Sequence, residues 1–414
     1  MKSYSSCQPP SPTGRRPAVD QRVPRWWALA AVGSALALVA LHKSTHRARA
    51  PLAALGAARV EQAQDAAATT DATASPTASS SAPHIVFVLV DDLGDNDIGY
   101  SSSDLQNVTH AINSLARNGV ILNQFYSMHM CTPARAALLT GRYPYRTGMQ
   151  LENVRPDSPW GLPLALTTLP ERLRDEANYR THAVGKWGLG HYAPEYLPTR
   201  RGFDSFYGFL SDEIDYFSHV YPQTFGIDTM RHYTDWLQLN GSNPEQYDTL
   251  HEQNNTYSTL LYTRKALDII TNHAAGSVVD NAALFLYYAA QNVHGPLDTP
   301  PQSMFTPGQW ASLEVVPQVA HRTQIAASLL ALDWSVERIV RALREKDMWK
   351  RTVLVVASDN GGCWAQGGSN MPLRGGKHFL FEGGVRVPAF VHSELIPPAR
   401  RGATFNGLFS VVDW

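Results

Sequence analysis

The stretch from Ile85 to Val90 constrains the fold of this chain more than any other part of the sequence. It is a continuous apolar run rich in β-branched residues, which is typical of a strand buried on both faces of a sheet. The runs from Thr352 to Ala357 and from Ala283 to Ala290 have the same character. Buried strands that alternate with helical segments predict an α/β fold, with a large, mainly parallel sheet flanked by helices.

Segments with helical spacing of their apolar residues lie between these strands. Helices are expected at 107–118, 168–177 and 326–346, and a further short strand is expected at 180–185. The last of these helices leads directly into the strand that begins at Thr352, as it would in a βα unit.

Two of the predicted strands end in oxygen-bearing side chains. Asp91 and Asp92 follow the first strand, whereas Asp359 and Asn360 follow the last one. Ligands of open α/β sheets bind at the carboxyl ends of the strands. If the two strands are near neighbours, these side chains converge, and such oxygen ligands select Ca²⁺ or Mg²⁺ over zinc. An Asp-Asp dipeptide taken by itself is more commonly a turn.

Cys131 lies where a loop is expected to pass into a helix, with Arg135 one turn further along. The helix N-terminus and the arginine would both favour an anionic or electron-rich group at position 131. A buried structural cysteine is the more common fate of a lone cysteine. With only three cysteines, the chain has too few for a disulfide framework.

Three further residues are candidates for binding an anion. Lys186 and Lys377 each lie in a glycine-rich segment, where freed backbone N–H groups and a lysine can together hold an oxyanion. His294 follows the strand that ends at Ala290. Without other context, a solvated lysine and a satisfied loop histidine are the more common cases.

The first 83 residues are predicted to lie outside the fold. Residues 1–25 form a basic tail, and 26–41 form an apolar run of 16 residues, slightly short of the about 17–25 that usually span a membrane. This run is interpreted as a signal anchor or a cleaved signal peptide, and less favourably as part of an organellar transit peptide. An Ala/Ser/Thr-rich linker follows at 42–83, and the globular domain at 84–414.

These features predict a protein of the secretory pathway. It would be membrane-anchored and lumenal or extracellular, or else lysosomal or secreted if the N-terminal segment is cleaved. Three glycosylation sequons, at Asn107, Asn240 and Asn254, agree with this route. The net charge of −1 offers no basic field for nucleic acid, and the 44% apolar content is that of a globular enzyme.

The motifs taken together resemble the sulfatase family. Cys131-Thr-Pro-Ala-Arg135, followed by Leu139-Thr-Gly-Arg142, matches the family signature Cys/Ser-x-Pro-x-Arg with its Thr-Gly-Arg continuation. The resemblance runs from about Ile85 to the last residue, and the chain looks most like the arylsulfatase B (N-acetylgalactosamine-4-sulfatase) branch. The family implies an alkaline-phosphatase-like α/β fold and hydrolysis of sulfate esters, either aryl sulfates or sulfated carbohydrates.

The resemblance also implies a modified nucleophile and a metal. Cys131 would be oxidised by the formylglycine-generating enzyme, and the hydrated aldehyde would attack sulfur and then eliminate sulfate. A single Ca²⁺ would polarise the sulfate group. Its implied ligands are Asp91, Asp92, the residue at 131, Asp359 and Asn360.

The remaining implied roles concern anion binding. Arg135 and Lys186 would hold the hydrate. Lys377 and His294 would bind the sulfate and the leaving oxygen.

The chain departs from the family at two places. The family usually reads Gly-Lys-Trp-His-Leu-Gly, and this chain has Gly188 where that histidine, the implied base for elimination, would stand. His191 and His129 are candidates to replace it. The sequence stops at Trp414, where relatives continue into a small C-terminal domain, so that domain is expected to be missing.

Two other classes of function share part of this pattern. A catalytically impaired, sulfatase-like binding protein is the alternative, because of Gly188. A phosphatase or phosphodiesterase of the same superfold is disfavoured by the Cys-x-Pro-x-Arg motif.

Overall fold

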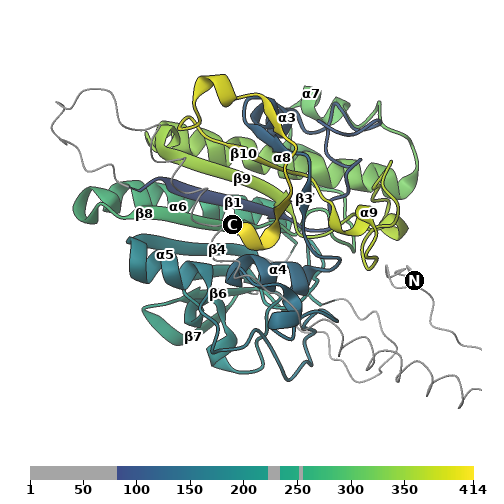
Figure 1. Cartoon of the computed structure of the whole chain (residues 1–414). Coiled ribbons are helices and arrows are strands. Elements are labelled where there is room, and N and C mark those ends of the chain that lie inside the picture. The colour runs from purple at the N-terminus through teal and green to yellow at the C-terminus, as the bar shows by residue number, and fades with distance from the viewer. Residues whose placement is uncertain (1–81, 222–233, 251–254) are drawn as a thin grey trace, which may run out of the picture. The chain divides into compact units, whose positions relative to one another are not determined.

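Parallel strands form the centre of a ten-stranded sheet in the computed structural model, which describes residues 82–221, 234–250 and 255–414 (Figure 1). Nearly all side chains of the three innermost strands are buried, as expected for strands covered on both faces. The prediction of an α/β fold is therefore confirmed. In spatial order the parallel strands are β9 (Thr352–Ser358), β1 (His84–Val90), β8 (Ala283–Ala289), β4 (Tyr179–Lys186) and β5 (Ser205–Phe209).

Further strands extend the sheet beyond both edges of this parallel centre. Beyond β9 lie β10 (Ala389–His392), which is antiparallel to its neighbours, then β2 (Val120–Leu122) and β11 (Ala403–Phe405). Beyond β5 lie β6 (Leu237–Asn240) and β7 (Asn243–Thr249), both antiparallel. The sheet as a whole is thus mixed. A separate two-stranded sheet joins β3 (Phe125–Tyr126) to β12 (Phe409–Ser410).

Helices cover both faces of the large sheet (Figure 1). One face packs against α3 (His110–Arg117), α6 (Ser258–Asp280) and α8 (Ala320–Glu345). The opposite face packs against α4 (Cys131–Thr140) and α5 (Leu169–Ala177). Two short helices, α7 (Pro307–Ala311) and α9 (Glu382–Val385), lie in loops.

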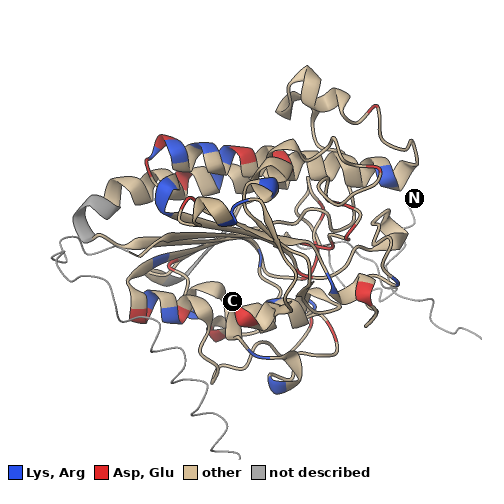
Figure 2. Cartoon of the chain, turned by 45° about the horizontal axis from the view of Figure 1, so that its top comes forward, with Lys and Arg blue, Asp and Glu red and all other residues tan. Residues whose placement is uncertain are grey.

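Successive residues of one strand enter two separate apolar cores. Val86 and Val88 of β1 lie in the core with α3, α6 and α8, whereas Phe87 and Leu89 lie in the core with α4. This alternation follows from the two-residue period of a strand. Charged residues lie mainly on the helices and in the loops, and few lie within the strands (Figure 2).

The predicted helices correspond to α3, α5 and α8, with shifted boundaries. The largest shift is in α8, which begins at Ala320 and not at 326. The long helix α6 was not predicted. The reason is visible in its sequence, since Lys265 and His273 interrupt its apolar pattern.

The predicted N-terminal tail and apolar segment, 1–25 and 26–41, lie outside the described residues, as does nearly all of the linker 42–83. Within the described ranges, no helix has the length and apolar character needed to cross a membrane.

Candidate active site

Four predicted ligand residues meet at the carboxyl ends of β1 and β9. The two strands pair in parallel, with Val90 opposite Ser358, so the residues that follow them leave the sheet side by side. The backbone N–H of Asp92 donates to Oδ1 of Asp359 at 3.2 Å. The amide Nδ2 of Asn360 donates to Oδ1 of Asp92 at 2.8 Å. None of these side chains, nor Asp91, is more than 2% exposed.

Cys131 is the first residue of α4 and points toward this cluster. Its Sγ lies 3.2 Å from Oδ1 of Asp91 and 4.0 Å from Oδ1 of Asp92. Burial and the neighbouring Asp91 carboxylate raise the pKa of the Cys131 thiol well above its usual value, and Lys186 only partly opposes them. The expectation of an anionic or electron-rich group at position 131 stays a prediction.

Two cations hold Asp91 and Asp359 from the side of β4 and α4. Lys186, the last residue of β4, donates from Nζ to Oδ2 of Asp91 at 2.6 Å. Arg135 pairs with Oδ2 of Asp359 at 2.9 Å and lies 3.5 Å from Oδ2 of Asp91. Although burial opposes ionisation of Asp91, Lys186, His294 and Arg135 together hold its pKa below the usual range.

The third cation, Lys377, pairs with Asp92. Its Nζ donates to Oδ2 of Asp92 at 2.8 Å and lies 2.9 Å from Nε2 of His294. Burial and the Lys377 charge lower the pKa of His294. His294 accepts a hydrogen bond at Nε2 from the Lys377 ammonium, while its Nδ1–H donates to the carbonyl of Gly295.

The oxygen atoms at the centre of this cluster fit a cation. Oδ1 of Asn360 is buried and has no hydrogen-bond donor, an arrangement that is unfavourable unless something else satisfies the oxygen. Ligand atoms of Asp91, Asp92, Cys131 and His294 lie within 4.8 Å of one another. Because Nε2 of His294 is taken by Lys377, the atoms left for a metal are mainly oxygens, which suit Ca²⁺.

The sulfatase family model matches residues 83–414. This chain belongs to the sulfatase family. It is similar to mouse arylsulfatase J, with 37% identity over 341 residues that make up 82% of this chain and 52% of that protein. It is also similar to mouse N-acetylgalactosamine-6-sulfatase, with 32% identity over 320 residues, 74% of this chain and 56% of that protein. The chain thus spans about half the length of these relatives.

A solved structure, that of Ps i-CgsB, supports the fold. It shares 29% sequence identity and a TM-score of 0.68, and the match covers 80% of this chain and 70% of that one. The same protein has been solved in complex with k-i-k-neocarrahexaose. The finer resemblance to the arylsulfatase B branch stays a prediction.

The position where this chain departs from its family faces the site. Gly188 has a φ of +68°, in the left-handed region, which histidine and asparagine adopt more readily than most residues. A Cβ at 188 would lie 3.6 Å from Cδ of Arg135 and 3.7 Å from Cε of Lys186, both ordinary contacts. Within the described residues, the hydrogen bonds and ion pairs of the site include no side chain of His191 or His129.

Two residues that sequence reasoning missed hold the loops of the candidate active site. Thr132 donates from Oγ1 to the carbonyl of Gly188 at 2.8 Å and accepts from the N–H of Val154 at 3.0 Å. Ser127 donates to the carbonyl of Asp359 at 2.6 Å. Thr132 lies inside the signature motif, so its sequence position was a usable signal, whereas nothing local distinguishes Ser127.

Proposed function

We propose that this chain hydrolyses sulfate esters of carbohydrates or aryl alcohols. The observation that carries the proposal is the position of residue 131, at the start of α4 against Asp91 and among paired carboxylates and cations. A relative named for N-acetylgalactosamine-6-sulfate and a similar structure solved with neocarrahexaose support a sulfated carbohydrate.

The proposed nucleophile is formylglycine, made from Cys131 after translation. The thiol itself is a poor nucleophile near neutral pH because its pKa is raised. A hydrated aldehyde at 131 would supply one hydroxyl for attack on sulfur and a second that allows sulfate to be eliminated. Asp91, 3.2 Å from the present Sγ, is placed to accept a hydrogen bond from one of these hydroxyls.

The proposed metal is one Ca²⁺, which when bound would polarise the sulfate oxygens. Asp91, Asp92, Asp359 and Asn360 would hold it, together with the group at 131. The unpartnered Oδ1 of Asn360 supports this assignment.

The three cations would have two roles: Lys186 and Arg135 would act on the nucleophile, and Lys377 would act on the substrate. Lys186 and Arg135 already lie beside Asp91 and would stabilise negative charge that develops at residue 131. Lys377 uses one N–H for Asp92 and one for His294. An ammonium has three donors, so one N–H is left for an oxygen of the substrate.

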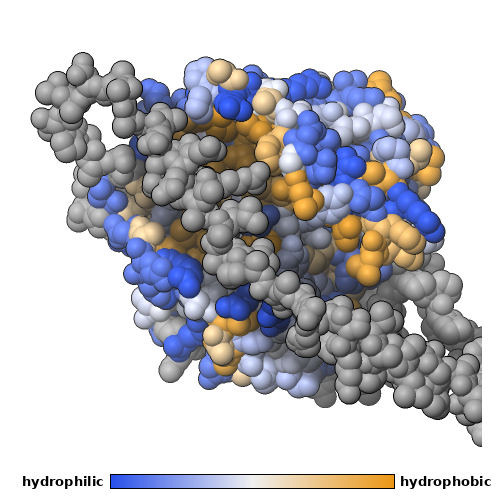
Figure 3. Space-filling model, in the orientation of Figure 1, coloured by the Kyte–Doolittle hydropathy of each residue, from blue (hydrophilic) through white to orange (hydrophobic). Residues whose placement is uncertain are grey.

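An exposed apolar surface precedes α9 and offers a place for the rest of the substrate. Figure 3 shows apolar side chains gathered on the side of the molecule where α9 lies in Figure 1. Aromatic faces of this kind bind sugar rings and aryl groups while leaving polar groups in water. The exposed large apolar residues of this segment are Trp364, Met371, Phe379, Leu380 and Phe381.

One experiment tests the proposed activity together with its nucleophile. The chain is co-expressed with a formylglycine-generating enzyme, then assayed with a chromogenic aryl sulfate in Ca²⁺, and the peptide containing residue 131 is weighed. Conversion makes the peptide about 18 Da lighter than the thiol form. We expect this mass together with hydrolysis. A converted peptide without hydrolysis, in a chain that still binds sulfated oligosaccharide, would establish the binding-protein alternative instead.

Gly188 leads to a separate expectation about turnover. We propose that attack on sulfur is retained and that release of sulfate is slow, because the implied base is absent. Gly188→His should raise the steady-state rate by about 10²–10⁴. Gly188→Asn is the matched control, since asparagine also tolerates the left-handed backbone but supplies no base. An unchanged rate, with no covalent sulfate accumulating in the parent, would refute this proposal.

A further inference from the structure

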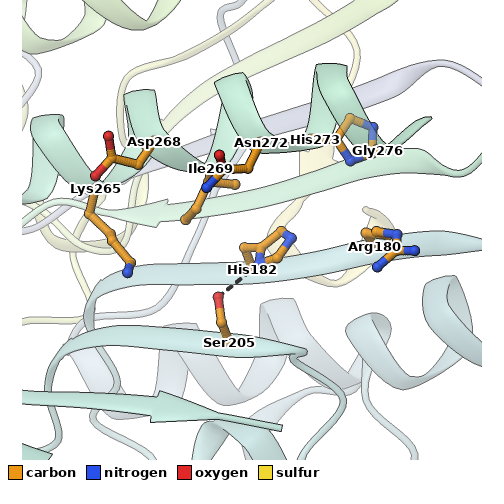
Figure 4. Close-up of a pocket in the computed structure, with 9 residues that line it drawn as sticks. All are labelled: Arg180, His182, Ser205, Lys265, Asp268, Ile269, Asn272, His273 and Gly276. Carbon is orange, nitrogen blue, oxygen red and sulfur yellow. Dashed lines mark hydrogen bonds between the residues drawn. The ribbon is translucent and has the colours of Figure 1, made fainter. Parts of the chain in front are cut away.

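A cavity of about 300 Å³ lies between the sheet and α6, at the amino ends of the parallel strands. Arg180 and His182 of β4 line it, with Lys265 and Asn272 of α6 facing them (Figure 4). The cavity is far from the candidate active site. Lys186 comes four residues after His182, which corresponds to roughly 13 Å along β4.

Apolar packing between α6 and the sheet ends at this cavity. Val184 of β4 and Ala266 and Ile270 of α6 belong to the buried core. Two and four residues earlier on the same face of β4, His182 and Arg180 replace apolar side chains. Interfaces between a helix and a sheet are normally apolar and close-packed. Packing alone therefore does not account for a cavity lined by polar side chains at this interface. Binding of a ligand would account for it.

Lys265 is a half-buried cation with neutral partners. Its Nζ donates to Oε1 of Gln238 at 2.9 Å and lies 5.4 Å from the centre of the Tyr207 ring. Burial lowers the pKa of Lys265, and the exposed Asp268 at the rim only partly opposes this. Lys265 makes no ion pair within the described ranges of the chain. A desolvated ammonium of this kind is stabilised by an anion.

His182 presents a second donor to the cavity. Its Nδ1 lies 2.7 Å from Oγ of Ser205, and its other ring nitrogen is turned away from Ser205 toward the cavity (Figure 4). If the Ser205 hydroxyl donates to Nδ1, the neutral ring carries its proton on Nε2 and donates into the cavity. Burial, together with the charges of His273 and Arg180, lowers the pKa of His182 to about 4.

We propose that this cavity binds a tetrahedral oxyanion, sulfate or phosphate, through Lys265, His182 and Asn272. Arg180, at the open side, adds positive charge to the same space. A metal is the wrong ligand, because no group of His, Cys and carboxylate side chains in the described residues brings its ligand atoms together here. The site is independent of the chemistry at residue 131.

Binding of radiolabelled sulfate by equilibrium dialysis tests the proposal in the full chain. Lys377→Ala is used as the background, because it removes the lysine proposed to bind sulfate at the candidate active site. In that background we expect sulfate still to bind and unlabelled phosphate to compete, whereas chloride at equal ionic strength does not. Adding Lys265→Met should weaken binding by about 10–100-fold, the loss expected for one charged hydrogen bond. Adding Lys265→Arg instead should preserve binding.

A second measurement guards against misfolding of the variants. The ring signals of His182 are identified in NMR spectra by their absence from His182→Gln. A bound oxyanion favours the imidazolium form, so sulfate should move the pKa of His182 upward in the parent and not in Lys265→Met. The proposal is overturned if the Lys377→Ala chain binds no sulfate, if Lys265→Met binds it as tightly, or if His182 does not respond.

Discussion

Two lysines near opposite ends of β4, Lys186 of the strand itself and Lys265 of the neighbouring α6, lie in opposite electrostatic surroundings. At the carboxyl end, Lys186 is 1% exposed and lies 2.6 Å from Asp91. Over the amino half of the same strand, Lys265 of α6 is half-buried and forms no ion pair with any described residue; its hydrogen bond goes to the neutral Gln238. A buried charge is tolerated where a partner and hydrogen bonds compensate for lost solvation. At the carboxyl end Asp91 compensates Lys186 for its lost solvation. Lys265 has no such carboxylate partner among the described residues.

The difference suggests two different uses of positive charge. Charges that are paired before the substrate arrives are rigid, and rigid dipoles and charges stabilise a transition state without having to reorganise. A cation without a counter-ion retains capacity to bind an anion. The same strand would thus support catalysis at one end and simple anion binding at the other. The predictions below challenge this contrast, beginning with the largest expected effect.

Cys131→Ala should have the largest effect, because it removes the proposed nucleophile. We expect kcat for an aryl sulfate to fall by about 10⁴-fold or more, equivalent to about 5.5 kcal/mol of barrier. The melting temperature should change little, because alanine is compatible with the first turn of α4 and removes only one small side-chain atom. Activity within tenfold of the parent would show that the chemistry does not depend on residue 131 and would remove the basis for contrasting the two ends.

Lys186→Met should have the next largest effect, and here the effect is on stability. Asp91 would keep Arg135 at 3.5 Å but lose its closest partner. Removing one member of a buried ion pair typically costs about 3–5 kcal/mol of unfolding free energy. Urea unfolding in calcium-free buffer measures it. A loss below about 1 kcal/mol would mean that the pairing at the carboxyl end contributes no more than a surface salt bridge.

Calcium should stabilise the carboxyl end by a smaller amount. At about a hundred times its Kd, a ligand specific for the folded state adds about 2.7 kcal/mol, which thermal melts with Ca²⁺ and with chelator would detect. Asn360→Ala should reduce this gain, because it removes the unpartnered oxygen. Asn118→Ala, at the exposed end of α3, is the control and should keep it. Equal calcium responses in both variants would exclude Asn360 as a ligand.

Lys265→Met should have the smallest effect of the four. The ammonium has no counter-ion within the described ranges, so replacing it with an apolar side chain should alter the unfolding free energy by less than about 1 kcal/mol, or raise it. Hydrolysis should stay within about twofold of the parent, because Lys265 touches no residue of the active site. If Lys265→Met destabilises the protein as much as Lys186→Met does, the two lysines near the ends of β4 do not differ in how their charges are compensated.

Much of the fold was predictable because it depends on local pattern. The runs that became β1, β8 and β9 are apolar throughout, and a strand buried on both faces requires that composition. The antiparallel edge strands and α6 were not predicted. Strands β6 and β10 have only four residues each, and β7 has a mostly polar sequence. Helix α6 turns Lys265 toward a cavity, which disrupts the apolar periodicity that identifies a helix.

The residues of the candidate site could also be predicted from the sequence, whereas most contacts between them could not. Asp91, Asp92, Asp359 and Asn360 could be chosen from the sequence because each follows a predicted buried strand. Their contact depended on β1 and β9 being direct neighbours, which is a matter of strand order. The hydrogen bond between Lys377 and His294 joins residues that are 83 positions apart, and no local signal marks it.

The sequence by itself therefore determined the buried strands, the signature at Cys131 and the types of side chain that end the strands, because these depend on neighbours along the chain. Only the tertiary structure decided which charges are paired and which are not. Lys186 and Lys265 are both lysines beside apolar segments, and what separates them is the presence of Asp91 within hydrogen-bonding distance of one alone. Electrostatic energy depends on distance and burial, and both are set by packing between segments far apart in the chain.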